Sequence, residues 1–338
     1  MPGLAPEAPL RLLVTGASGF VGRHLMPVLR RSFPRATLIA TLRPSDNAGP
    51  EAIGLDADET VAFDLLQPDA MAPMLRTVRP DGLVHLAAKA SVSASFADPM
   101  ASWRANLLGT LALGEAVLDE APGCRLVLAS SAEVYGLSFR TRAPLDEGPP
   151  MRPANPYAAS KAACDLAIGE MALRGLDAVR LRAFNHTGPG QSEDFVVASF
   201  ARQIARVEQG LQAPELRVGA LDRWRDFLDV RDVCIAYAAA LRGPAGDAAA
   251  SEPGLVLNLA SGASRRIGDI LDGLLSLSTA RPQVEVEPAR LRPTDLEYVA
   301  GDATRAHQML GWVPATPWDT TLNDVLEDWR RRVRQGLG

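Results

Sequence analysis

The chain has 338 residues, of which 47% are hydrophobic and 22% charged, and its formal net charge is −5. This apolar content is enough for one large core with a smaller second domain, and it excludes an intrinsically disordered chain. The acidic balance, without any long basic run, argues against binding to nucleic acid or to an anionic membrane.

Three further features predict a cytoplasmic protein without a metal. Residues 1–9 lack the basic region and the long apolar stretch of a signal peptide, and no apolar run reaches the length of a membrane span. The cysteines, at positions 124, 164 and 234, form no CxxC pair, which suits a reducing compartment. The four histidines are isolated and show no metal-ligand spacing.

Short apolar runs alternate with helical periodicity over the first half of the chain. The expected strands are 11–15, 37–42, 60–64, 83–87, 125–129 and 178–182, and the clearest helices are 24–31, 103–118 and 156–173. Because alternating buried strands and helices form parallel sheets, this pattern predicts an α/β fold, a doubly wound parallel Rossmann sheet with ligands at its carboxyl edge.

The pattern changes after residue 185. Helices are expected at 195–209, 230–241, 267–277 and 322–333, a strand at 255–259 and a surface loop at 243–251. We therefore expect a dinucleotide-binding domain over 10–183, to which the chain returns near 228–260. A smaller mixed α/β substrate-binding domain is expected from 184–227 and 261–335.

The turn after the first strand carries the pattern GxxGxxG at Gly16, Gly19 and Gly22. Glycine at such a turn lets the backbone approach a pyrophosphate at the N-terminus of the following helix. A glycine pattern alone could be an ordinary turn, but the strand before it and the helix after it favour dinucleotide binding. The other residues expected at the cofactor in this turn are Ser18, Phe20 and Val21.

The end of the second strand indicates which dinucleotide is bound. An acidic residue there would accept the ribose 2′-hydroxyl of NAD, whereas this chain has Arg43, which can pair with a 2′-phosphate. We therefore predict NADP(H), with NAD(H) possible because Asp46 is near. After the third strand, Asp64 and Leu65 are either adenine contacts or an ordinary polar strand end.

Tyr157 and Lys161 follow a helix start at Asn155-Pro156, and their i, i+4 spacing places them on one helix face. A free tyrosine has a pKa near 10, and a nearby ammonium with a bound oxidised nicotinamide would lower it. The pair then predicts proton transfer beside a hydride carrier, with Lys161 also at the nicotinamide ribose and Ser131 holding the substrate oxygen. An incidental Tyr and Lys on an amphipathic helix is the alternative.

These residues resemble the extended short-chain dehydrogenase/reductase family, over about 11–329. The shared elements are the glycine turn, HLAA at 85–88, Asn106, the Ser131/Tyr157/Lys161 triad and the late RDF and DVRD motifs. The resemblance implies an NAD(P)H-dependent oxidoreductase acting on a nucleotide sugar, and a homodimer formed by the helices near 103–118 and 156–173. It adds further cofactor contacts at Leu86, Ala87, Ala88 and Phe184.

A narrower resemblance, to the GDP-4-keto-6-deoxy-D-mannose reductases, rests on residues 182–191, 224–227, 291–294 and 301–312. It implies NADPH-dependent reduction of the C4 ketone to give GDP-D-rhamnose. The GDP-sugar contacts that it implies are Lys89, Ser131, Glu133, Asn185, Val196, Arg225, Arg292 and Asp295. Two arginines from separate segments can clamp a diphosphate, although either could also be a surface charge.

Three alternatives remain: a GDP-mannose 4,6-dehydratase, a nucleotide-sugar 4-epimerase and a non-catalytic nucleotide sensor. The intact triad argues against the sensor. Related dehydratases carry Thr-Asp-Glu or Thr-Ser-Glu where this chain has Ser131-Ala132-Glu133. Ala132 cannot relay a proton, which favours the reductase, while Glu133 is either a site carboxylate or a packing residue.

Overall fold

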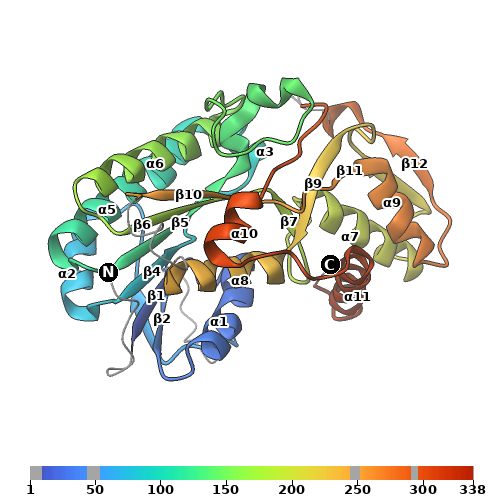
Figure 1. Ribbon diagram of the computed structural model, residues 1–338. Coiled ribbons are helices and arrows are strands. Elements are labelled where there is room, and N and C mark those ends of the chain that lie inside the picture. Colours follow the sequence, from blue (N-terminus) through green and yellow to red (C-terminus); the bar gives the residue numbers. More distant parts are fainter. Residues whose placement is uncertain (1–9, 44–53, 244–251, 291–295, 338) are drawn as a thin grey trace.

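A seven-stranded parallel sheet forms the centre of the molecule (Figure 1). The computed structural model describes residues 10–43, 54–243, 252–290 and 296–337. The sheet has the order β10-β6-β5-β4-β1-β2-β3. Its strands are β1 (Arg11–Thr15), β2 (Thr37–Leu42), β3 (Glu59–Ala62), β4 (Gly82–His85), β5 (Arg125–Ser131), β6 (Ala178–Ala183) and β10 (Leu255–Leu259). The strand order reverses between β1 and β4, so their carboxyl ends form the edge at which ligands bind in such sheets.

Helices cover both faces of this sheet because its strands, apart from the exposed edge strand β3, are largely apolar on both sides. Leu12 and Val14 of β1 belong to a core shared with α1 (Phe20–Ser32) and α8 (Val230–Arg242). Leu13, between them, belongs to a second core on the other face. That second face is covered by α2 (Met71–Val78), α5 (Gly109–Glu120) and α6 (Pro156–Leu173).

The approach to α5 is not the single helix predicted over 103–118. Two short helices, α3 (Val92–Ala97) and α4 (Pro99–Ser102), lead into a π-helical stretch, Trp103–Leu108, and α5 follows directly. Such π-helical stretches often occur at functional sites. This one contains Asn106, whose buried side chain makes the contacts described below.

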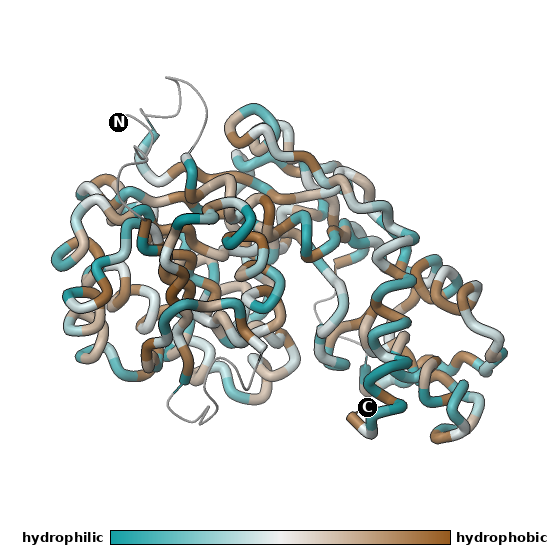
Figure 2. The backbone as a smooth tube through the Cα atoms, turned by 90° about the horizontal axis from the view of Figure 1, so that it is seen from below, coloured by the Kyte–Doolittle hydropathy of each residue, from teal (hydrophilic) through white to brown (hydrophobic). Residues whose placement is uncertain are grey.

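A smaller unit lies beside the central sheet (Figures 1 and 2). It contains a three-stranded sheet, β11-β9-β7, and a two-stranded sheet, β12-β8. Its helices enclose a separate core that includes Phe200, Phe227 and Trp329. The elements are β7 (Asn185–Thr187), α7 (Val196–Glu208), β8 (Glu215–Val218), β9 (Trp224–Asp229), β11 (Ser264–Arg266), α9 (Ile267–Ser276), β12 (Gln283–Val286) and α11 (Trp318–Arg334). Between β12 and α11, helix α10 (Thr304–Leu310) packs near β10.

The predicted fold class is confirmed, whereas several element bounds were wrong. The helix predicted from residue 24 begins at Phe20, and the strand predicted over 83–87 ends at His85 because the next residues form the loop beside the glycine turn. The short strands β7, β8, β9, β11 and β12 were not predicted, since brief and largely polar strands carry no clear alternation. The domain bounds stay a prediction, and the predicted loop beyond Gly243 lies outside the described residues.

Within the described ranges, no helix is both long enough and apolar enough to cross a bilayer. The same ranges contain no group of three or more side chains suited to hold a metal ion.

Candidate active site

The glycine turn is shaped by close backbone contacts that only glycine allows. Gly16 has φ +73°, and a Cβ there would lie 2.9 Å from the backbone N of Ala87. A Cβ on Gly22 would lie 2.4 Å from the carbonyl oxygen of Ala17. Helix α1 begins directly after Gly19, without a side-chain cap and without an acidic residue in its first turn. The positive end of the helix therefore remains suited to a pyrophosphate.

Hydroxyl side chains join this turn to the neighbouring strand ends. The N–H of Ala87 donates to Thr15 Oγ1 at 3.3 Å, and the N–H of Gly16 donates to Thr41 Oγ1 at 3.3 Å. The loop of residues 86–88 is thus held against the turn, and its contact with a cofactor stays a prediction. Sequence reasoning missed these supporting threonines, although a hydroxyl at the end of a parallel strand is a recognisable signal.

His85 lies buried beneath the same loop. Its Nδ1 is 2.7 Å from Thr15 Oγ1, and its Nε2 is 3.0 Å from Thr110 Oγ1 on α5. Burial, assisted by the nearby Lys161 cation, lowers the pKa of His85 to about 3. The imidazole therefore stays neutral near pH 7 and serves as a hydrogen-bonding link between β1 and α5.

The residues expected to select and hold the adenosine differ in their surroundings. Arg43 is exposed directly after β2, next to the turn, while Asp46 lies outside the described residues. Asp64 accepts the N–H of Leu66 at 2.9 Å, which is the local contact of a polar strand end. Leu65 packs so closely on α5 that a Cβ on Gly109 would lie 2.8 Å from it. These local contacts are compatible with either interpretation of Asp64 and Leu65, so their contact with adenine stays a prediction.

Tyr157, Ser131 and Glu133 come together at the start of α6. Asn155 caps the helix as predicted, with Oδ1 accepting the N–H of Ala158 at 2.8 Å, while its Nδ2 donates to Glu133 Oε2 at 3.1 Å. Burial raises the pKa of Tyr157 to about 12, the Ser131 hydroxyl lowers it in part, and the Glu133 charge raises it further. In the protein without cofactor, burial therefore raises the pKa of Tyr157. The lowered pKa predicted from the sequence requires a bound oxidised nicotinamide and stays a prediction.

Lys161 lies one helical turn beyond Tyr157 and is buried. Its Nζ donates to the carbonyl oxygen of Ala129 on β5. Burial lowers the pKa of this ammonium, while Cys164 and Asp165 raise it. Helix α6 and the end of β5 are thus joined by Lys161, the residue that is expected to lower the pKa of Tyr157.

Asn106 positions a second loop against α6. Its Oδ1 accepts the N–H of Lys89 at 2.8 Å, and its Nδ2 donates to the Lys89 carbonyl at 3.1 Å and to Ser160 Oγ at 3.0 Å. Lys89 itself is exposed beside this anchor. The π-helical stretch that carries Asn106 therefore holds the backbone of Lys89, a predicted substrate contact, next to the helix of Tyr157.

The remaining predicted contacts lie partly in the smaller unit. Asn185 is exposed on β7 and pairs in register with Phe227 of β9, which places Arg225 two residues away on the neighbouring strand. Val196 is the first residue of α7. Phe184 is buried against Phe139, so its side chain is part of the core. The other two predicted substrate contacts, Arg292 and Asp295, lie outside the described residues.

Comparison with known proteins finds relatives over nearly the whole chain. A family model described as GDP-mannose 4,6 dehydratase matches residues 13–325. The chain is 37% identical to a GDP-6-deoxy-D-mannose reductase of Pseudomonas aeruginosa, covering 96% of this chain and 99% of that protein. It is 29% identical to GDP-mannose 4,6 dehydratase 1 of Arabidopsis thaliana, covering 78% of this chain and 72% of that protein. The solved structure of RMD from Pseudomonas aeruginosa, complexed with NADPH, is 34% identical with a TM-score of 0.80, covering 96% of this chain and 98% of that one.

Proposed function

Because the chain belongs to the extended short-chain dehydrogenase/reductase family, through the model described as GDP-mannose 4,6 dehydratase, we propose that it is an NADPH-dependent reductase of a nucleotide sugar. The reaction is reduction of the C4 ketone of GDP-4-keto-6-deoxy-D-mannose to GDP-D-rhamnose. The observation that carries this proposal is 37% identity, over nearly the whole of both chains, to a GDP-6-deoxy-D-mannose reductase.

NADPH fits the carboxyl edge of the sheet. The turn from Gly16 to Gly22 offers a backbone cradle that any Cβ would fill, at a helix end with no acidic side chain. Arg43 follows β2, where a 2′-phosphate is recognised in such sheets, so NADP(H) is preferred and NAD(H) remains a weaker alternative. The bound cofactor supplies the hydride for the ketone carbon. A neighbour of known structure is complexed with NADPH.

Tyr157 donates the proton to the sugar O4. Its raised pKa keeps the phenol protonated at neutral pH, which suits a residue that must give a proton during reduction. The Ser131 hydroxyl, which interacts with Tyr157, orients the ketone oxygen. The buried Lys161 ammonium, anchored on Ala129, stabilises the phenolate that remains after proton transfer.

The GDP-sugar extends from this centre into the smaller unit. Asn185 and Arg225 lie on the neighbouring strands β7 and β9, and the guanidinium of Arg225 suits a diphosphate oxygen. Lys89, Glu133 and Val196 complete the contacts among the described residues. Arg292 and Asp295 are further proposed contacts, outside those residues.

A dehydratase is the second candidate, and Glu133 is the observation that favours it. Dehydration needs a base for the C5 proton and an acid for the C6 hydroxyl in addition to the C4 chemistry. The Glu133 carboxylate is close enough to Tyr157 to raise its pKa, whereas Ala132 is buried and has no polar group.

One experiment separates the two candidates. The protein is given GDP-4-keto-6-deoxymannose with NADPH, and separately GDP-mannose with catalytic NADP⁺. We expect loss of nicotinamide absorbance in the first reaction, and no loss of water by mass in the second. Dehydration at a rate comparable to ketone reduction would overturn the assignment.

A homodimer and a cytoplasmic location also belong to this proposal. Leu166 and Leu173 on α6 are 62% and 76% exposed, seven residues apart on one face, and Leu108 before α5 is 57% exposed. An apolar face of this kind favours association of two copies. Leu166→Glu should therefore halve the mass measured by light scattering. The location is supported by three buried cysteines that form no disulfide.

A further inference from the structure

A buried carboxylate, Asp165, lies on the helix that carries the proposed catalytic pair. It follows Lys161 by four residues and Tyr157 by eight, so the three side chains share one face of α6. Its side chain has no exposed surface. No step of the proposed reaction uses this group, yet an ionised carboxylate is costly to bury unless it is fully paired.

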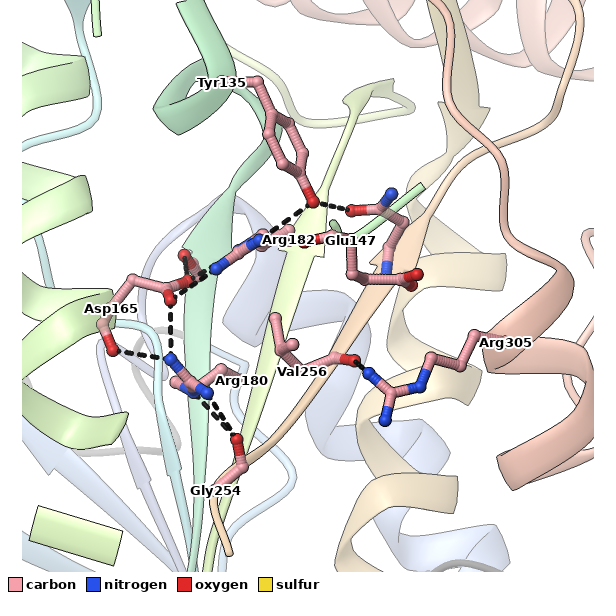
Figure 3. Close-up of polar contacts among 10 residues, drawn as sticks. Tyr135, Glu147, Asp165, Arg180, Arg182, Gly254, Val256 and Arg305 are labelled. Atoms are coloured by element: carbon pink, nitrogen blue, oxygen red, sulfur yellow. Dashed lines mark hydrogen bonds and ion pairs between the residues drawn. The ribbon is translucent and has the colours of Figure 1, made fainter. Parts of the chain in front are cut away.

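Asp165 is paired on several sides (Figure 3). Oδ2 of Asp165 accepts hydrogen bonds from Ser130 Oγ at 2.5 Å and from Arg182 Nε at 3.0 Å. Oδ1 of Asp165 accepts hydrogen bonds from Arg182 Nη2 and from Arg180 Nη1, each at 2.9 Å. These four bonds connect α6 with the carboxyl-end half of β5 and with β6, and they hold the pKa of Asp165 below its ordinary value against the effect of burial.

The contact with Ser130 reaches the site most directly. Ser130 lies between Ala129, whose carbonyl accepts Lys161 Nζ, and Ser131, whose hydroxyl interacts with Tyr157. The last residues of β5 are therefore bonded to α6 at two consecutive positions, one through Lys161 and one through Asp165. Without the Ser130 bond, this strand end would keep its bonds to α6 through Lys161 and Tyr157 but would lose the one that ends on a buried, fully paired carboxylate.

The guanidinium of Arg182 extends the same network. Its Nη1 donates to the phenol oxygen of Tyr135 at 3.0 Å, and that phenol donates to Asn258 Oδ1 at 2.7 Å (Figure 3). Tyr135 follows Ser131 in the chain, so the segment after β5 is held as well. Arg182 lies on β6 only three residues before Asn185, where the proposed sugar contacts begin.

We propose that Asp165, acting through Ser130, is a positioning residue that fixes Ser131 and the Ala129 carbonyl opposite Tyr157 and Lys161. This inference rests on the proposed function, because the geometry it fixes is that of proton transfer to the ketone. A buried ion pair contributes little net stability compared with apolar residues of similar volume, so geometry is the stronger reason for this one. A misplacement of about 1 Å can cost about 10²-fold in rate.

The test uses Ser130→Ala, with Thr321→Val as the matched control. Thr321 is also a buried hydroxyl that donates to a buried carboxylate, Asp229, at 2.8 Å, and Asp229 is likewise paired with an arginine, Arg231. The control pair lies on α11 and β9, away from Tyr157 in the fold. Both variants lose one comparable hydrogen bond, so a merely structural role predicts the same effect for both.

We expect Ser130→Ala to lower kcat about tenfold, with KM changed less than twofold, whereas Thr321→Val keeps kcat. The deuterium isotope effect on kcat, with NADPH labelled at the transferred hydrogen, should rise only in Ser130→Ala, because the chemical step becomes slower. The two variants should lose similar amounts of Tm. Equal kcat in the two variants, or a loss of kcat that follows Tm in both, would overturn the proposal.

A substrate-free measurement separates this proposal from the proposed function. The chain has four tyrosines, so ¹³C labelling at the ring Cζ atom alone gives four signals, and Tyr157→Phe assigns the one of interest. Ser130→Ala should shift the Tyr157 signal in the NADP⁺ complex, and Thr321→Val should leave it in place. An unshifted signal would refute the positioning role even if the wild type reduces the ketone. A shifted signal would support that role even if the wild type fails to reduce it.

Discussion

The neutral, buried His85 makes a quantitative prediction about acid stability. Its pKa is about 3 in the folded chain against an ordinary 6.5, so below pH 6.5 the unfolded chain binds a proton that the folded chain does not. The stability that this group confers is complete above pH 6.5 and is lost progressively as the pH falls toward 3. At pH 5, the loss should be about 2 kcal/mol, since each pH unit below 6.5 costs about 1.4 kcal/mol.

The assay is urea unfolding of the wild type and of His85→Gln at pH 7 and at pH 5. Glutamine cannot titrate, but its amide can still donate and accept between Thr15 and Thr110. The variant is expected to be less stable at pH 7, and its deficit should shrink by about 2 kcal/mol at pH 5. His307→Gln, at an exposed position, is the control and should keep the wild-type dependence. If the wild type and His85→Gln lost the same free energy of unfolding from pH 7 to pH 5, the reasoning would be refuted.

The remaining predictions concern catalysis and ligand selection. Tyr157→Phe should lower kcat by about 10²-fold or more with little change in NADPH affinity, and near-normal turnover would remove this residue from the mechanism. Arg43→Ala should erase most of a preference of about ten- to a hundredfold for NADPH over NADH, whereas equal kcat/KM of the wild type with both would contradict the assignment. Arg225→Ala and Arg292→Ala should each raise KM more than they lower kcat and should weaken GDP inhibition, and unchanged GDP affinity in both would make them surface charges.

The central fold was predictable from the sequence because most of its strands are buried on both faces. A strand such as residues 37–42 is then a largely apolar run, and the turn at Gly16 marks where the first strand ends. The helix start at Asn155 was equally legible, since an N-cap followed by proline has a direct physical reason. These local signals placed Tyr157 and Lys161 on α6 and the glycine turn at the carboxyl edge of the sheet.

The contacts between these parts could not be predicted, because they join residues far apart in the sequence. Nothing local to Asp165 indicates that two arginines of β6 and a serine of β5 surround it. The π-helical stretch at Asn106 interrupts what the sequence pattern predicts as one helix. Its role is visible only in the fold, where the Asn106 amide bonds the Lys89 backbone. The effect of burial on Tyr157, which raises its pKa in the protein without cofactor, was likewise not predictable, since solvent exclusion is a property of the assembled fold.

Asn155 shows how the two candidate reactions share one framework. A single side chain caps α6 with its oxygen and holds the Glu133 carboxylate with its nitrogen, so the position of Glu133 is tied to the helix that carries Tyr157. That arrangement keeps a carboxylate near Tyr157, as either reaction would allow. What distinguishes the reactions is then the neighbouring position, where Ala132 is buried and has no group to protonate a leaving hydroxyl. The missing polar group at this position therefore favours the reductase, in agreement with the identity to a GDP-6-deoxy-D-mannose reductase.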